Sequence, residues 1–248
     1  MGERTVTAAI VIIGNEILSG RTKDVNLSWL AERLNRIGVR VLEGRIVADQ
    51  AEAIIAAVND CRGRYDYVFT TGGIGPTHDD ITSECVARAF GVPLVLHPQA
   101  KALLERQYRP GELNAARLRM AHVPEGAELV INPVSAAPGF RIENVFVLAG
   151  VPAIMQAMFG GVEPLLEGGR PMLTRTVAAH LGEGVVAKGL GELQDRYADL
   201  EIGSYPFFRQ GRFGASFVVR GTDEGRLAAC VAEIEALVRS LGAEPLED

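Results

Sequence analysis

A glycine-rich turn over residues 72–80, Gly-Gly-Ile-Gly-Pro-Thr-His-Asp-Asp, constrains this chain more than any other stretch of it. The apolar run at 68–71 predicts a short buried strand before the turn, and residues 82–90 predict a helix after it that ends at Gly91. Glycines let the backbone approach a ligand closely, and a helix N-terminus offers free N–H groups and the positive end of its dipole. The stretch therefore predicts a site for an anion such as a phosphate group.

Two adjacent acids, Asp79 and Asp80, stand in this turn and would repel a bare phosphate. A divalent cation between the carboxylates and the phosphate oxygens would remove the conflict, because Mg²⁺ prefers hard oxygen ligands. The alternative is that one of the two acids only caps the following helix, since Asp is a preferred residue at that position. The spacing matches neither the dinucleotide-binding fingerprint nor the P-loop.

The composition is that of an ordinary globular protein, with 248 residues, a net charge of −6 and 48% hydrophobic residues. This length fits one large domain, or a medium domain and a small one. The acidic balance argues against a nucleic-acid partner, and no apolar run reaches the roughly 18 residues that a membrane span needs. Three widely spaced cysteines form neither a metal motif nor a disulfide framework. We therefore expect a cytoplasmic protein without a signal peptide, whose partner is neither nucleic acid nor membrane.

Three runs predict strands, and a helical pattern follows each of them: the apolar, β-branched run 6–13, and then 39–47 and 65–71. This alternation predicts an α/β fold of three layers with a mostly parallel sheet. Polar turns come after all three runs, at 14–20, at Asp49 and at 72–80. Ligands in such sheets bind beyond the carboxyl ends of the strands, so a central first strand would bring the three turns to one crevice. For Asp49 the alternative is a simple helix N-cap.

The rest of the first domain predicts helices and strands in the following places: helices from 98 to 108, over 114–120 and from 152 to 159, and strands over 129–131 and 145–148. Arg117 and Arg119 lie on the second of these helices, where they either reach a phosphate or are solvated at the surface. Gly150 follows the last strand and is a further candidate for close approach of the backbone to a ligand.

Glycines and prolines between 160 and 171 predict a domain boundary, which gives an α/β domain at 1–168 and a small α+β domain at 169–248. The second domain predicts a β-α-β-β-α order, and we find no catalytic constellation in it. Its basic hairpin, with Arg209 and Arg212, is either a solvated turn or a contact for a partner. The aromatic residues beside it predict partly exposed side chains and a homo-oligomer: Phe207, Phe208 and Phe213.

The pattern as a whole resembles the molybdopterin-binding MoaB/MogA-type fold. It is more closely similar to the amino-terminal branch of the competence- and damage-inducible CinA proteins and to the molybdopterin-binding-like domain of FAD synthases. The resemblance rests on six stretches: 13–20, 24–26, Asp49, 71–82, 123–127 and 138–140. The second domain is similar to the KH-like domain of CinA proteins. Their carboxy-terminal amidase domain has no counterpart in these 248 residues, so we expect no amidase activity.

The resemblance implies a cleft for a phosphorylated small molecule, either a pterin such as molybdopterin or a nucleotide, with a divalent cation such as Mg²⁺ as cofactor. It implies Glu16, Asp49 and Asp80 as metal ligands, and Asp80, Asp79 and Glu16 as catalytic residues. The residues that it implies for substrate binding are Gly14, Asn15, Ser19, Gly20, Asn26, Gly72, Gly73, Ile74, Gly75, Pro76, Thr77, Pro138, Gly139 and Gly150.

Two residues depart from the family pattern: Asn15 stands where Asp is usual, and Ala149 stands where Pro is common. The first departure removes one possible metal ligand and leaves Glu16 to serve. Three functions stay open at this point. The chain is a metal-dependent pyrophosphatase acting on a dinucleotide such as ADP-ribose or FAD, a carrier without turnover, or an interaction module with a vestigial cleft. His78 is either a general base of the enzyme or a solvated side chain.

Overall fold

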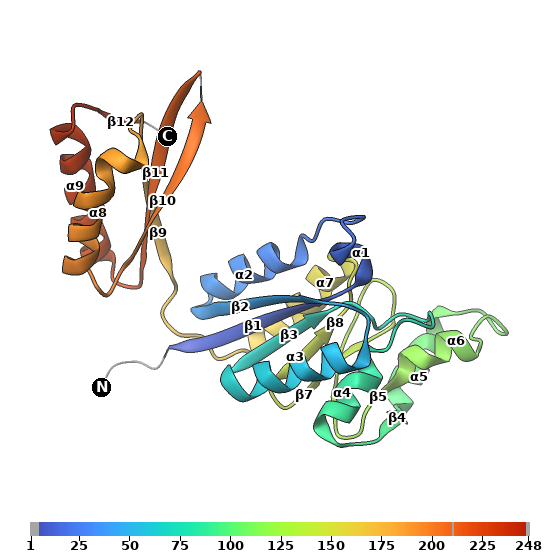
Figure 1. Ribbon diagram of the computed structural model, residues 1–248. Coiled ribbons are helices and arrows are strands. Elements are labelled where there is room, and N and C mark those ends of the chain that lie inside the picture. Colours follow the sequence, from blue (N-terminus) through green and yellow to red (C-terminus); the bar gives the residue numbers. More distant parts are fainter. Residues whose placement is uncertain (1–4, 210, 247–248) are drawn as a thin grey trace. The chain divides into compact units, whose positions relative to one another are not determined.

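The computed structural model describes residues 5–209 and 211–246, and the chain divides into two compact units between Gly169 and Arg170 (Figure 1). The boundary expected after residue 168 lies one residue away from this division. Within the described ranges, no helix has the length and apolar character needed to cross a membrane.

The first unit is built on a six-stranded sheet with the order β2-β1-β3-β8-β7-β6. The strands of this sheet are β1 (Val6–Ile13), β2 (Val39–Val47), β3 (Tyr67–Thr71), β6 (Glu128–Val130), β7 (Gly139–Ile142) and β8 (Val145–Leu148). The first four in the spatial order are mutually parallel, and β7 and β6 are antiparallel additions at the edge. The sheet is therefore mostly parallel, as expected, and β1 lies between β2 and β3.

The register of the parallel strands brings their carboxyl ends to one edge of the sheet. Ile13 of β1 pairs with Val47 of β2, while Thr71 of β3 pairs with Ile12 on one side and with Leu148 of β8 on the other. The residues that follow these four strands consequently leave the sheet close together. This is the edge at which parallel α/β sheets bind ligands.

Helices cover both faces of this sheet and give the three layers that the sequence predicts (Figure 1). One face packs against α2 (Asn26–Arg36) and α7 (Pro152–Val162), and the other packs against α3 (Ala51–Arg64) and α4 (Thr82–Phe90). Side chains of β1 alternate between the two cores, because successive residues of a strand point to opposite faces. Ile10 lies in the core with α2 and α7, whereas Val11 lies in the core with α3 and α4.

Short elements complete the first unit, and several of them were not predicted. They are α1 (Asn15–Leu18), β4 (Leu94–Leu96), α5 (Pro98–Gln107), α6 (Ala115–Leu118), the 3-10 turn η1 (Arg119–Ala121), β5 (His122–Pro124) and the 3-10 turn η2 (Glu163–Leu165). The helix expected over 114–120 is divided into α6 and η1. Strands β4 and β5 form a separate antiparallel pair. Strand β7 begins at Gly139, although the Pro138-Gly139 sequence is typical of a turn.

The second unit has the expected β-α-β-β-α order and ends in one further short strand. Its elements are β9 (Leu173–Ala179), α8 (Glu183–Arg196), β10 (Glu201–Arg209), β11 (Arg212–Gly221), α9 (Glu224–Ser240) and β12 (Pro245–Leu246). The antiparallel sheet has the order β10-β11-β9-β12, and both helices pack on one face of it around Phe217. Phe208 and Phe213 are exposed near the end of the β10–β11 pair. Assembly of copies through these residues stays a prediction.

Candidate functional site

The exits of the four parallel strands line one pocket of about 520 Å³. This volume lies within the range of small-molecule sites in proteins. Among the residues that line the pocket are eleven of those predicted from the sequence: Glu16, Asp49, Gly72, Gly73, Ile74, Gly75, Pro76, Thr77, Asp79, Asp80 and Gly150. The crevice expected from the order of strands and polar turns is therefore present.

The first two glycines of the loop after β3 are fixed by the backbone around them. Gly72 has a φ of +104°, and a Cβ there would lie 2.1 Å from the carbonyl oxygen of Ile13. Gly73 has a φ of +67°, and a Cβ there would lie 2.2 Å from Oγ1 of Thr82. The N–H of Gly72 donates to the carbonyl of Leu148 at 3.2 Å. Gly72 is predicted to bind the substrate, but its N–H is not free for a phosphate, because the sheet uses that donor.

The next part of the loop offers free donors to the pocket. Within the described chain, the N–H groups of Gly73, Ile74 and Gly75 make no hydrogen bond. The loop leads into α4, whose first residue Thr82 is anchored by two hydrogen bonds of 2.9 Å, from its N–H to the Gly73 carbonyl and from its hydroxyl to the Gly72 carbonyl. Three unpaired amides close to a helix N-terminus form a favourable surface for an anion.

Asp80 closes a short turn with Thr77 and does not cap α4. Its Oδ2 accepts hydrogen bonds from the N–H of Thr77 at 2.8 Å and from the hydroxyl of the same residue. The N-cap residue of α4 is Ile81, and no side chain caps that helix. The alternative that Asp79 or Asp80 serves as the cap is therefore wrong. Oδ1 of Asp80 makes no hydrogen bond to the described residues, so the turn leaves one carboxylate oxygen free.

The two residues between Thr77 and Asp80 are more open to solvent. The side chain of His78 is 96% exposed, which agrees with its interpretation as a solvated residue. Asp79 lines the pocket and its side chain is 61% exposed. The polar side chain of Thr77, followed by the backbone amide of Asp79 itself, holds the pKa of the Asp79 carboxyl below its ordinary value. Asp79 is therefore a charged group at the rim of the pocket at neutral pH.

Asp49 joins the exits of β1 and β2. Its Oδ2 accepts a hydrogen bond of 2.7 Å from the N–H of Asn15, and its Oδ1 makes none to the described residues. The N-cap of α3 is Gln50, without a side-chain cap, so Asp49 is not the helix cap that the alternative proposed. Glu16 lies beside it in the pocket, with its carboxylate 2.6 Å from the position that a Cβ on Gly14 would take.

Asn26 supports the pocket from behind and does not line it. The side chain is 5% exposed, and its Nδ2 donates to the carbonyl of Gly150 at 2.7 Å and to Oγ1 of Thr71 at 3.5 Å. Gly150 in turn lies close to the glycine loop, because a Cβ on it would lie 3.1 Å from the Cα of Gly72. Asn26 therefore ties the exits of β3 and β8 to the first residue of α2.

Several predicted residues do not line the pocket: Gly14, Asn15, Ser19, Gly20, Asn26, Pro138 and Gly139. Gly14 and Asn15 still contact residues that line it: Gly14 lies against the Glu16 carboxylate, and the N–H of Asn15 donates to Asp49. Ser19 donates to the carbonyl of Glu16 at 3.2 Å at the surface. Gly139 is buried in β7, where a Cβ would lie 2.1 Å from the carbonyl oxygen of Val147, so packing explains this glycine.

Sequence reasoning missed one wall of the pocket, which Asn132, Ser135 and Ala137 line. Asn132 is 4% exposed and organises this wall through four hydrogen bonds. Its Oδ1 accepts from the N–H groups of Val134 and Ser135, and its Nδ2 donates to Oγ of Ser135 and to the carbonyl of Ala137. The sequence carries one signal here, the Asn132-Pro133 pair, which is typical of a turn but does not indicate a turn beside the site.

The donor set suits a hard cation that the substrate helps to bind. In the described ranges, no three or more His, Cys, Asp or Glu side chains gather into a ready-made metal cluster. The predicted ligands Glu16, Asp49 and Asp80 line the same pocket, and the last two keep one carboxylate oxygen free. Mg²⁺ is typically held by one or two carboxylates, with waters and substrate phosphates completing the coordination. The residues present therefore fit this mode of binding.

These features define an α/β protein with a pocket for an anionic ligand at the carboxyl edge of a parallel sheet. Residues 9–168 match the family described as probable molybdopterin binding domain, and residues 171–245 match the family described as FAD synthase, middle domain. The chain belongs to the molybdopterin-binding domain family, within its CinA-like branch. The resemblance inferred from the sequence is thereby confirmed.

Three relatives illustrate the similarity. A protein of Aeropyrum pernix is 45% identical over 167 residues, which are 64% of this chain and 62% of the relative. A CinA-like protein of Citrifermentans bemidjiense is 43% identical over 156 residues, which are 60% of this chain and 38% of the relative. The crystal structure of CinA from Thermoplasma acidophilum, a protein of unknown function, is 34% identical with a TM-score of 0.61, and covers 64% of this chain and 96% of its own. The chain thus spans less than two thirds of the length of the first two relatives.

Proposed function

We propose that this protein binds a phosphorylated pterin or nucleotide in the 520 Å³ pocket and hydrolyses the pyrophosphate of a dinucleotide such as ADP-ribose or FAD. One observation carries the proposal. Asp49 and Asp80 are each held by a backbone N–H through one oxygen and keep the other oxygen free, in a pocket that also contains unpaired amides. The two names of the matching families, molybdopterin binding and FAD synthase, agree with a pterin or flavin nucleotide as ligand.

The glycine loop would bind the phosphates. The N–H groups of Gly73, Ile74 and Gly75 have no acceptor in the described chain, and the first residue of α4, Thr82, is hydrogen-bonded to the carbonyl of Gly73. A phosphate placed here would receive several hydrogen bonds together with the favourable field of the helix dipole. The same donors would stabilise the additional negative charge that develops while a pyrophosphate bond is broken.

The acidic residues would orient the attacking water. A divalent cation, when bound by Asp49, Asp80 and the substrate phosphates, would neutralise charge on the pyrophosphate and lower the pKa of water. The hydrogen bonds from Asn15 and Thr77 fix the orientation of the two carboxylates before the substrate arrives. Water attacks one phosphorus, the bridging P–O bond breaks, and FAD gives AMP and FMN, while ADP-ribose gives AMP and ribose 5-phosphate. Glu16 lies in the same pocket and would accept a proton from the attacking water.

A carrier without turnover is the second candidate, and one observation favours it. The acids in the described ranges do not form a complete metal cluster by themselves. A carrier would use the free amides of the glycine loop to hold a phosphorylated pterin, and the carboxylates would then affect only the affinity.

The experiment that separates these functions measures AMP release from FAD, ADP-ribose and NAD with Mg²⁺, Mn²⁺ or Co²⁺, beside a chelated control. Asp49→Asn and Asp80→Asn are the informative variants, because Asn keeps an oxygen that accepts the hydrogen bond from Asn15 or Thr77 but removes the charge. Asp195→Asn, an exposed acid of the second unit, is the matched control. Metal-dependent AMP release that both site variants lose and the control keeps supports the enzyme.

The absence of AMP release has two different meanings, which thermal unfolding separates. A ligand at about a hundred times its dissociation constant should stabilise the protein by about 2.7 kcal/mol. Stabilisation by one of the three nucleotides or by molybdopterin, without turnover, would support the carrier. No stabilisation by any of them would indicate an interaction module with a vestigial cleft and would contradict the proposal.

A further inference from the structure

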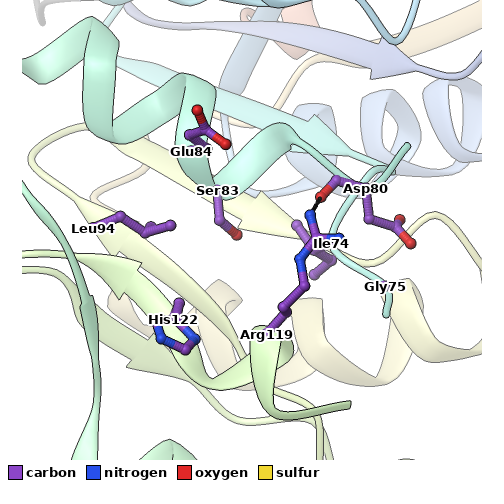
Figure 2. A pocket seen from close by; sticks show the side chains of 8 residues that line it. All are labelled: Ile74, Gly75, Asp80, Ser83, Glu84, Leu94, Arg119 and His122. Carbon is purple, nitrogen blue, oxygen red and sulfur yellow. Dashed lines mark hydrogen bonds between the residues drawn. The ribbon is translucent and has the colours of Figure 1, made fainter. Parts of the chain in front are cut away.

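A second pocket, of about 160 Å³, lies against the same glycine loop (Figure 2). Ile74, Gly75 and Asp80 line both pockets, so this part of the loop is the wall between them. The remaining lining residues of the smaller pocket come from α4, β4, η1 and β5: Ser83, Glu84, Leu94, Arg119 and His122. We call it the rear pocket, to distinguish it from the larger pocket of the proposed ligand.

Arg119 reaches from the rear pocket to the turn that carries the acids. Its Nη1 donates to the carbonyl of Thr77 at 3.1 Å. Its Nη2 donates to the carbonyl of Asp80 at 3.2 Å (Figure 2). The sequence left two roles open for this arginine, contact with a phosphate or solvation. The structure leaves Arg119 exposed at the surface, and its guanidinium is engaged with two backbone carbonyls of the loop.

The turn from Thr77 to Asp80 is thus held in two ways. From inside, Oδ2 of Asp80 accepts from the N–H of Thr77 at 2.8 Å, and the N–H of Asp80 donates to the carbonyl of Thr77 at 3.3 Å. From the rear pocket, Arg119 binds the carbonyls at both ends of the turn. The planar fork of an arginine can bridge two acceptors at fixed separation, which the single ammonium group of a lysine does poorly.

We propose that Arg119 is a positioning residue, which holds the Thr77–Asp80 turn so that Asp80 keeps its free oxygen in the pocket. The expected effect of Arg119 on turnover rests on the proposed hydrolysis. Its expected effect on the stability of the Thr77–Asp80 turn does not. Arg119 needs no contact with the ligand in this role. Its neighbour Met120 lines the large pocket, so η1 has residues in both pockets and supports the loop from its own packed position.

Arg117 provides a matched control two residues away. Its guanidinium donates to the carbonyl of Glu112 at 2.6 Å and lies 4.4 Å from the ring of Tyr108, so it does not contact the turn. Removal of Arg117 deletes the same charge from the same short stretch of chain. A difference between Arg119→Ala and Arg117→Ala therefore reports the two hydrogen bonds to the turn rather than the loss of a surface arginine.

The first test measures hydrogen exchange of the peptide that contains residues 77–80, in the full-length protein without ligand. We expect exchange of this peptide to become at least about fivefold faster in Arg119→Ala, since local opening of a loop follows its local stability. Arg117→Ala should exchange like the wild type. Equal exchange in all three proteins would overturn the proposal, whether or not the protein is an enzyme, so the two failures are distinguishable.

The second test uses turnover and chemical rescue. We expect Arg119→Ala to lower kcat by about tenfold to a hundredfold, the scale of a displaced catalytic group, with a smaller change in KM. Millimolar guanidinium should restore part of that rate, because it fits the enlarged rear pocket and can bridge the same carbonyls, while methylammonium should not. The kcat of Arg119→Lys should lie between that of the wild type and that of Arg119→Ala. A rate loss that guanidinium does not relieve, or an equal loss in Arg117→Ala, would contradict the positioning role.

Discussion

Oδ2 of Asp49 accepts a 2.7 Å hydrogen bond from the backbone N–H of Asn15, a residue 34 positions earlier in the chain. The bond joins the turn after β1 to the turn after β2, directly at the edge where the parallel strands end. It also consumes one carboxylate oxygen of Asp49 and leaves the other free in the pocket. The relationship explains how an acid can be held in a fixed orientation without being neutralised by a neighbouring cationic side chain.

Two substitutions of Asp49 should therefore distinguish its contribution to stability from its contribution to catalysis. Asp49→Asn keeps an acceptor for the N–H of Asn15, so its free energy of unfolding should be close to that of the wild type. Asp49→Ala loses the hydrogen bond and should cost about 1 kcal/mol in urea unfolding. Both variants should lose AMP release. Turnover retained in Asp49→Asn would show that the charge of Asp49 has no catalytic role.

Gly72 should tolerate no side chain. Its φ is +104°, and a Cβ would lie only 2.1 Å from the Ile13 carbonyl oxygen, so the backbone must shift in Gly72→Ala. We expect the free energy of unfolding to fall by about 1–3 kcal/mol, the cost of a residue forced into such a conformation. Gly63→Ala is the control, because Gly63 lies in α3 with open space around it and alanine favours a helix by about 1 kcal/mol. Urea unfolding of the full-length protein measures the stability of both variants. Similar stabilities for Gly72→Ala and Gly63→Ala would contradict this explanation of the loop.

Asn26 should matter for stability although it does not line the pocket. Asn26→Ala removes the hydrogen bond from the buried Asn26 side chain to the carbonyl of Gly150, which should cost about 1 kcal/mol. Asn26→Asp should cost at least as much at neutral pH, because it places a buried carboxylate against that carbonyl. Asn35→Ala, in the same helix, should change stability little. Chemical unfolding tests all three variants, and an Asn26→Asp variant as stable as the wild type would be inconsistent with the hydrogen bond to Gly150.

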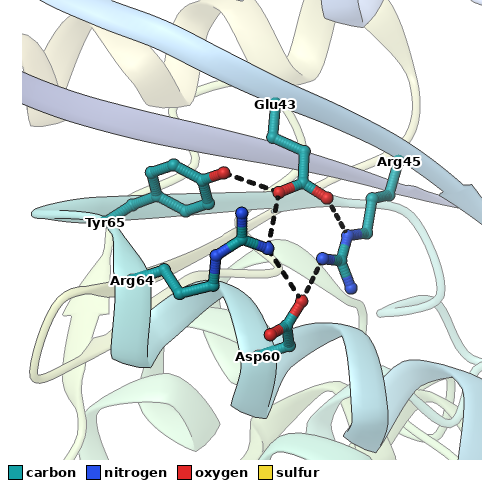
Figure 3. A network of polar contacts seen from close by, with 5 residues as sticks. All are labelled: Glu43, Arg45, Asp60, Arg64 and Tyr65. Atoms are coloured by element: carbon teal, nitrogen blue, oxygen red, sulfur yellow. Dashed lines mark hydrogen bonds and ion pairs between the residues drawn. The ribbon is translucent and has the colours of Figure 1, made fainter.

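A polar network between β2 and α3 should make stability depend on pH in the acidic range (Figure 3). Glu43 accepts hydrogen bonds from Arg45 and from the hydroxyl of Tyr65, the latter at 2.6 Å, and pairs with Arg64 at 3.2 Å. The hydrogen bond from Arg45, followed by that from Tyr65, lowers the pKa of Glu43 from its ordinary value of 4.5. Arg45 similarly lowers the pKa of Asp60.

The sign of this effect follows from the lowered pKa in the folded state. The unfolded chain binds protons first as the pH falls, so the network contributes fully above about pH 4.5 and its contribution is lost as the pH falls through the folded pKa. We expect the difference in Tm between the wild type and Glu43→Gln to shrink below pH 4.5. Glu125→Gln, at an exposed position, should show no such trend. A Tm difference for Glu43→Gln that stays constant down to pH 3 would contradict this explanation.

The sequence predicted much of the α/β unit because its signals are local. Strand β1 has the predicted bounds, since residues 6–13 are almost all apolar and are followed by Gly14. Gly91 ends α4 in a left-handed conformation, as its position after the helical pattern indicated. The convergence of the polar turns also followed, because the direction of parallel strands is fixed once strands and helices alternate.

The features that were missed depend on contacts between distant residues. Strands β4 and β5 have three residues each, too few for a periodicity to be visible. The wall built by Asn132 is a turn that tertiary packing brings to the pocket. The cap expected from Asp79 or Asp80 was wrong because the Asp80 carboxylate binds the backbone three residues before it. Arg119 donates hydrogen bonds to the same turn from about 40 residues further along the chain, so no local pattern in the sequence indicates these bonds.

The most direct measurement of the central claim is AMP release from FAD or ADP-ribose by the wild type and by Asp80→Asn, with Mg²⁺ and with a chelator. The account predicts AMP from the wild type only when the metal is present, and at least about a hundredfold less from the variant, the usual scale of a lost electrostatic contact in catalysis. Equal AMP release by both proteins, or release that the chelator does not abolish, would contradict the assignment of this pocket as a metal-dependent pyrophosphatase site.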